Sequence, residues 1–85
     1  MRPTKMKVLT TKEIRELPEG SIVREHSLDK YGYPQYLDIT VEHRDGKVKF
    51  YYYNGDGRRV ETKLRSFKPD DPYRYYELIK KGETV

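Results

Sequence analysis

The chain contains no cysteine, no tryptophan and no alanine among its 85 residues. Without cysteine it cannot form a disulfide, and thiolate nucleophiles and cysteine-ligated metal sites are excluded. Asparagine and glutamine occur only once each, as Asn54 and Gln35, whereas charged residues make up 38% of the chain. That combination is typical of heat-adapted proteins, so we expect a thermophilic source, archaeal or viral.

Long apolar runs are also missing. The longest run is far too short to cross a membrane, and the basic N-terminal residues lack the apolar core of a signal peptide. We therefore expect a cytoplasmic protein with no membrane partner. Leucine, isoleucine, valine and phenylalanine number only 18, and nine tyrosines supply the remaining ring area for a core. We expect one domain over residues 1–85, with residues 1–7 and 83–85 loose.

Two glycine turns in the middle of the chain predict three consecutive antiparallel strands. Asp45-Gly46 tolerates the positive φ angles of a two-residue hairpin turn, and closing the chain there pairs Val41 with Phe50. At the second turn, a two- or four-residue loop would place Phe50 opposite Glu61. A three-residue loop, Gly55-Asp56-Gly57 with its last residue left-handed, keeps that face apolar. The predicted apolar face contains Leu37, Ile39, Val41, Val48, Phe50, Tyr52, Val60 and Leu64.

The opposite face of the predicted sheet is cationic and aromatic. On the apolar face, this register pairs Tyr52 with Val60 and Val48 with Leu64. Residues 47–68 carry seven cations and two anions, a local net charge of +5. Because cations neutralise phosphates and tyrosines stack on bases, we expect a small, largely sequence-tolerant nucleic-acid-binding protein. A solvated face with cross-strand ion pairs fits the pattern equally well. The candidate nucleic-acid-binding residues are Lys49, Tyr51, Tyr53, Arg58, Arg59, Lys63 and Arg65.

The segments that flank these strands carry helix signals. Thr10 followed by Glu13 forms a capping-box pattern and predicts a short helix that ends near Leu17, before a first strand at residues 21–26. Pro69-Asp70-Asp71-Pro72 predicts a C-terminal helix capped by its second aspartate. The predicted helix runs to about Lys81 and stops at Gly82, and its inward stripe contains Tyr75, Leu78 and Ile79. The fold expected is mainly β (α+β), a small antiparallel meander or barrel with one helix at each end.

Residues 48–81 show an order of elements that is found in a known family. Val48-Lys49-Phe50-Tyr51-Tyr52-Tyr53-Asn54-Gly55-Asp56-Gly57-Arg58-Arg59 is followed by Pro69-Asp70-Asp71-Pro72 and then by residues 73–81. This part of the chain resembles the second half of the small basic archaeal chromatin proteins, which have an SH3-like (chromo-like) barrel. The resemblance implies that a three-stranded sheet binds duplex DNA in the minor groove. The chain differs from that family in having no tryptophan and fewer lysines.

Patterns typical of catalysis or metal binding are weak in this chain. An EF-hand frame around Asn54-Gly55-Asp56-Gly57 would place Tyr52 and Lys63 at ligand positions, which excludes a calcium cage. His26 and His43 lie on different predicted strands, with no neighbouring residues at ligand spacing. Asp70-Asp71 is explained by helix capping. We therefore expect no enzymatic activity, no metal and no cofactor.

A second hypothesis for function uses the tyrosines. Tyrosine rings can anchor a protein–protein interface, so the chain could be a protein-interaction module or a small regulator or inhibitor of a virus or plasmid. The tyrosines could equally fill the margin of a core that is short of aliphatic residues. Nucleic acid and a protein partner both stay open at this point. The candidate protein-contact residues are Tyr31, Tyr33, Tyr36, Tyr73 and Tyr76.

Overall fold

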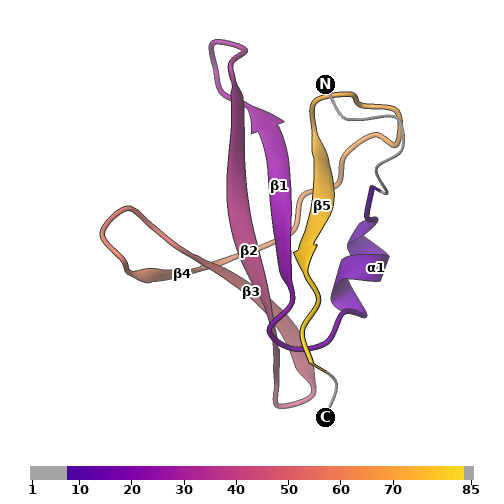
Figure 1. The fold of residues 1–85 in the computed structure, drawn as a ribbon, viewed down its shortest axis with the longest axis vertical. Helices are drawn as coiled ribbons and strands as arrows, with labels where there is room; N and C mark the ends of the chain where they lie inside the picture. The colour runs from indigo at the N-terminus through magenta and orange to yellow at the C-terminus, as the bar shows by residue number, and fades with distance from the viewer. Residues whose placement is uncertain (1–7, 84–85) are drawn as a thin grey trace.

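The computed structural model describes residues 8–83, which form a five-stranded antiparallel sheet and one short helix (Figure 1). Along the sheet the strand order is β4-β3-β2-β1-β5, so β4 and β5 are its edges. The mainly β prediction is confirmed, whereas the sheet is open and closure into a barrel is not confirmed. The elements are α1 Thr11–Arg15, β1 Ile22–Leu28, β2 Pro34–Arg44, β3 Lys47–Tyr53, β4 Arg59–Thr62 and β5 Tyr75–Lys80.

The register predicted from the two glycine turns is confirmed over most of its length. Val41 lies opposite Phe50 and Tyr52 lies opposite Val60. Gly57 has a φ of 77°, as the three-residue loop requires, and its amide donates to the carbonyl of Asn54 at 2.9 Å. The loop forms as predicted because glycine, which has no Cβ atom, adopts the left-handed conformation without a steric cost.

The predicted pairing of Val48 with Leu64 is wrong. β4 ends at Thr62, which lies opposite Phe50, and the chain then leaves the sheet. Leu64 nevertheless packs against the core, as a partly buried neighbour of the buried residues. The chain after β4 therefore crosses the inner face of the sheet instead of extending it.

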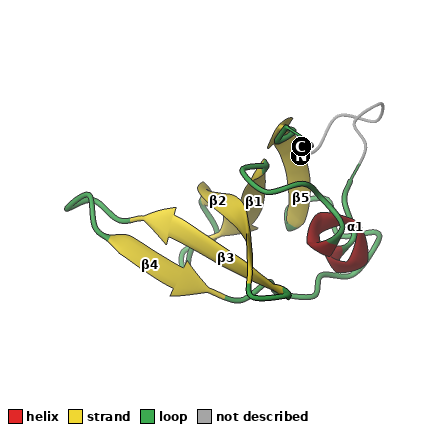
Figure 2. Cartoon of the chain, turned by 90° about the horizontal axis from the view of Figure 1, so that it is seen from below, coloured by secondary structure: helices red, strands yellow, loops and turns green. Residues whose placement is uncertain are grey.

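One face of the sheet carries the core, and α1 covers it. The sheet curls, and α1 lies on its inner side (Figure 2). The capping box is confirmed: the amide of Glu13 donates to Oγ1 of Thr10 at 3.1 Å, and its carboxylate accepts from the Thr10 amide at 3.1 Å. From α1, Ile14 enters the core and is fully buried. The buried hydrophobic cluster contains Leu9, Ile14, Val23, Ile39, Val41, Phe50 and Tyr76.

The predicted C-terminal helix is wrong, because residues 75–80 form β5 and pair antiparallel with β1. Asp71 does accept hydrogen bonds from the amides of Tyr73 (2.8 Å) and Arg74 (2.9 Å), as a helix cap would. The same side-chain chemistry also closes an isolated turn, so it does not commit the chain to a helix. The backbone N–H and C=O groups along the edge of β1 need hydrogen-bond partners. A strand at residues 75–80 provides them, whereas a helix would not.

The predicted inward stripe of that helix is also wrong. Tyr75 is buried, but Leu78 and Ile79 are exposed, and Tyr76 is buried instead with 2% of its surface exposed. Gly82 does not stop a helix. A Cβ atom there would overlap the carbonyl oxygen of Glu19, so close approach of two backbone segments requires the glycine.

The predictions of loose termini fall mostly on residues 1–7 and 84–85, which lie outside the described part of the chain. Glu83, also predicted to be loose, is described and exposed. Within residues 8–83, no helix has the length and apolar character needed to span a membrane.

Candidate functional site

The outer face of β2, β3 and β4 carries the central part of the predicted nucleic-acid surface. The guanidinium of Arg59 lies 3.7 Å from the ring centroid of Tyr51 and donates from Nη2 to Oε1 of Glu42 at 2.7 Å. This hydrogen bond lowers the pKa of Glu42 and raises the pKa of Arg59. The positive charge of Arg59 is therefore compensated by Glu42 on the same sheet. Its guanidinium also covers a face of the Tyr51 ring on which a base would have to stack.

Two further predicted cations are also paired within the protein. Nζ of Lys49 lies 3.6 Å from Oε1 of Glu61 on the neighbouring strand. Arg65 is not on the outer face as predicted, because the chain has already left the sheet, and it donates to Oε1 of Glu25 at 2.7 Å. Both contacts reduce the positive charge available to a phosphate.

The remaining members of the predicted set are separated. Arg58 and Lys63 have no carboxylate partner among residues 8–83, but Arg58 lies in the turn between β3 and β4, and Lys63 lies after the end of β4. Tyr53 is 62% exposed and contacts Tyr51 edge to face, with ring centroids 5.7 Å apart. The structure therefore brings together Lys49, Tyr51, Tyr53 and Arg59 on the outer face. Lys63 lines a cleft together with Lys49 just after β4, Arg58 lies in the turn, and Arg65 lies away from this face.

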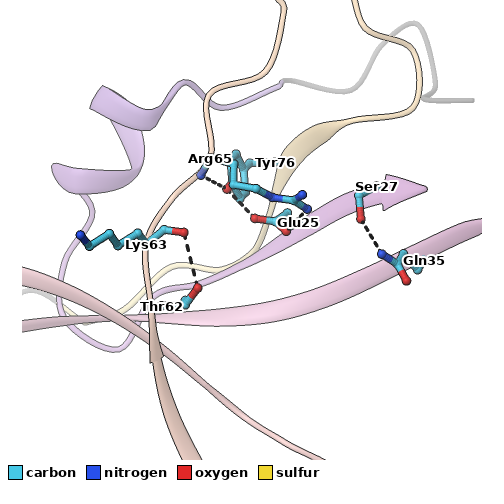
Figure 3. Close-up of polar contacts among 7 residues, drawn as sticks. All are labelled: Glu25, Ser27, Gln35, Thr62, Lys63, Arg65 and Tyr76. Atoms are coloured by element: carbon cyan, nitrogen blue, oxygen red, sulfur yellow. Dashed lines mark hydrogen bonds and ion pairs between the residues drawn. The ribbon is translucent and has the colours of Figure 1, made fainter. Parts of the chain in front are cut away.

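A polar network that the sequence did not predict lies on the inner face of the sheet (Figure 3). The Tyr76 hydroxyl donates to Oε2 of Glu25 at 2.6 Å and accepts from the Arg65 amide at 2.9 Å. Burial, together with the carboxylate of Glu25, raises the pKa of Tyr76. Tyr76 is thus a core residue and is not available as the predicted protein contact. A signal existed in the alternation of Val23, Glu25 and Ser27, which places the carboxylate on the core face.

The most exposed aromatic side chains gather at one end of the sheet, around the loop between β1 and β2. Tyr31 and Tyr33, in that loop, are 73% and 68% exposed. Oδ1 of Asp29 accepts from the amides of both tyrosines at 2.9 Å, and its own amide donates to the Tyr33 carbonyl at 2.9 Å. Gly32 provides the positive φ of 84° that closes the loop. The backbone that presents these two rings is therefore fixed by its own hydrogen bonds.

An ordered row on the outer face continues this aromatic end. His26 lies opposite Tyr36 on β2 and opposite Tyr75 on β5, and its ring stacks on Tyr75 with centroids 4.4 Å apart. Tyr36 is 64% exposed, with the guanidinium of Arg24 4.3 Å from its ring centroid. Asp38 holds that guanidinium through two hydrogen bonds, of 2.8 and 3.1 Å. We call Tyr31, Tyr33 and Tyr36 the tyrosine end. Tyr73, the remaining predicted protein contact, is 46% exposed and lies in the turn before β5.

Comparisons with models of protein families, with curated proteins and with solved structures give no significant match. The resemblance to archaeal chromatin proteins therefore stays a prediction. Within residues 8–83, no group of three or more histidine, aspartate or glutamate side chains could hold a metal ion. Function has to be inferred from the geometry of the chain itself.

Proposed function

We propose that the protein is a protein-interaction module and that it binds its partner through the tyrosine end. The observation that supports this proposal is the pair Tyr31 and Tyr33, two exposed rings on a loop fixed by Asp29. A ring with few rotatable bonds on a rigid backbone loses little conformational entropy when it is buried by a partner. Such residues are frequent among those that dominate the binding energy of interfaces.

The charge distribution supports the same proposal. Next to the loop, the cation Arg24 is neutralised by Asp38, and in the loop itself Nζ of Lys30 lies 5.1 Å from the ring centroid of Tyr31. This one cation does not form a row that could follow a phosphate backbone. Three of the four net positive charges of the chain come from Arg2, Lys5 and Lys7. The other residues together are close to neutral, so the net charge of the chain does not by itself decide between an aromatic and an electrostatic interface.

Sequence-tolerant nucleic-acid binding is the second candidate, and it rests on three other side chains. Arg58 and Lys63 have no carboxylate partner in the described part of the chain, and Tyr53, which is 62% exposed, lies at the end of β3 next to the turn that carries Arg58. Together they could contact phosphates and one base. Under either proposal the protein acts without catalysis and without a cofactor.

A binding experiment that compares two variants distinguishes the two candidates. Peptides selected from a random displayed library against the immobilised protein are tested for binding to Tyr31→Ser/Tyr33→Ser and to Tyr53→Ser as the matched control. We expect binding to be lost only in the double variant and to persist in about 0.5 M salt, where surface charges are screened. Equal binding of the peptides to both variants would contradict the proposal.

The second candidate is tested in parallel with random duplex and single-stranded DNA at low salt. Binding that weakens steeply with salt and falls in Arg58→Ala/Lys63→Ala, but not in Tyr31→Ser/Tyr33→Ser, would favour nucleic acid. Absence of DNA binding at tens of micromolar would remove that candidate.

A further inference from the structure

A second surface lies near the far end of β2, away from the tyrosine end. There, a cleft of about 610 Å³ opens between the first half of β3, the end of β4 and the last turn of α1. It forms because β4 stops at Thr62, so that Val48, which pairs with His43 on β2, has no partner on the β4 side where Leu64 was expected to pair. We call it the Phe50 cleft, after the most buried of the residues that line it.

The floor of the Phe50 cleft is apolar and continuous with the core. Val48 and Leu64 are partly buried and pack against the buried cluster, and Phe50 belongs to that cluster. With only 4% of its surface exposed, Phe50 offers no open ring face on which a base could stack. Val48 and Leu64 are only half-buried, so part of each aliphatic side chain is open to a partner.

The wall of the Phe50 cleft is cationic. Three cations line it. One of them, Lys49, pairs with Glu61, and the distance from Nζ to Oε1 is 3.6 Å. Arg15 lies 5.7 Å from the ring centroid of Phe50 and has no carboxylate partner among residues 8–83, and the same is true of Lys63. The cleft therefore combines an apolar floor with two uncompensated positive charges.

We propose that the Phe50 cleft binds an acidic segment of a partner protein. One apolar side chain of that segment enters between Val48 and Leu64, and carboxylates beside it pair with Arg15 and Lys63. Charge complementarity sets the sign of the ligand, and the apolar floor selects a peptide over a phosphate backbone, which would leave that floor uncovered. This inference does not depend on what binds at the tyrosine end.

The test uses the full chain and a short fluorescein-labelled peptide of glutamates around a single leucine, followed by fluorescence anisotropy. We expect the charge reversals Arg15→Glu/Lys63→Glu to weaken binding by about tenfold or more, since two favourable charge pairs become repulsive. The matched control is Lys80→Glu/Lys81→Glu, which changes the net charge equally at exposed positions that do not line the cleft. Its affinity is expected to stay within about twofold of the wild type.

Two further measurements separate the alternatives. Replacing the leucine of the peptide with serine should remove most of the affinity, and amide NMR shifts on titration with the leucine peptide should concentrate around Val48, Leu64 and Arg15. Equal binding of the serine peptide, equal weakening by both double variants, or displacement by a single-stranded oligothymidylate at equal concentration would overturn the proposal. So would the absence of any shift at millimolar peptide, provided that circular dichroism shows the variants to be folded.

Discussion

The hydroxyl of Tyr76 donates a 2.6 Å hydrogen bond to Oε2 of Glu25, across the pairing of β5 with β1. The same hydroxyl accepts from the amide of Arg65, whose guanidinium bonds the other oxygen of that carboxylate. The buried carboxylate of Glu25 thus links β1 and β5 to the chain segment after β4, which crosses the inner face. The sheet edge at β5 and the crossing segment are stabilised by the same three residues.

Tyr76→Phe is expected to lower the free energy of unfolding by about 1–3 kcal/mol. The ring would still fill its place in the core, but the Arg65 amide would lose its acceptor and Glu25 would lose a donor in a buried position. Urea denaturation of the variant measures the loss. Tyr53→Phe is the control, because no hydrogen bond of that exposed hydroxyl is needed by the core. An equal loss in both variants would mean that the network does not stabilise the fold.

Stability should also respond to alkaline pH through Tyr76. Its pKa is raised in the folded protein, by burial first and by the carboxylate of Glu25 second, above the usual value of 10. Below pH 10 the hydroxyl is protonated in both states, so the stabilisation is complete. Above pH 10 the unfolded chain releases this proton first, and the stabilisation declines as the pH approaches the raised pKa. The stability advantage of the wild type over Tyr76→Phe should therefore shrink when urea unfolding is repeated above pH 10.

Gly82→Ala is expected to destabilise the protein by more than about 1 kcal/mol. The new Cβ would overlap the carbonyl oxygen of Glu19 and lie 2.8 Å from the Ser21 amide nitrogen, so two backbone segments would have to separate. Gly55→Ala is the control, because no atom lies within 4 Å of its Cβ position. A thermal melt of each variant decides the matter, and an unchanged or higher melting temperature for Gly82→Ala would contradict the expected packing.

The parts of the fold that the sequence predicts correctly are those fixed by nearby residues. Asp45-Gly46 and Gly55–Gly57 specify their turns through backbone angles, and the turns then set which residues of β2, β3 and β4 face each other. Thr10 and Glu13 define the start of α1 in the same local way. In each case the interaction partners lie within a few residues, so a pattern in the sequence determines the geometry.

The parts that the sequence does not predict depend on distant partners. Asp71 makes the hydrogen bonds of a helix cap, yet the edge of β1, far away in the sequence, decides that a strand follows. After β4 ends at Thr62, Arg65 likewise bonds a distant residue, Glu25 on β1, and not a residue of the neighbouring strand β3. The candidate nucleic-acid face lost two cations because they lie after the end of β4. The pairing of Arg59 with Glu42 was foreseeable only as a general possibility of cross-strand ion pairs.

Tyr31→Ser/Tyr33→Ser should leave stability unchanged while removing the binding proposed for the tyrosine end. Both rings are mostly exposed, so their loss removes little buried area, and the free energy of unfolding should stay within about 0.5 kcal/mol of the wild type. The Asp29 hydrogen bonds go to backbone amides, so the loop keeps its shape in the variant. Urea denaturation and amide NMR spectra check these two expectations. A large loss of stability would show that the rings belong to the fold, and would leave the exposed aromatic surface without a proposed role in binding.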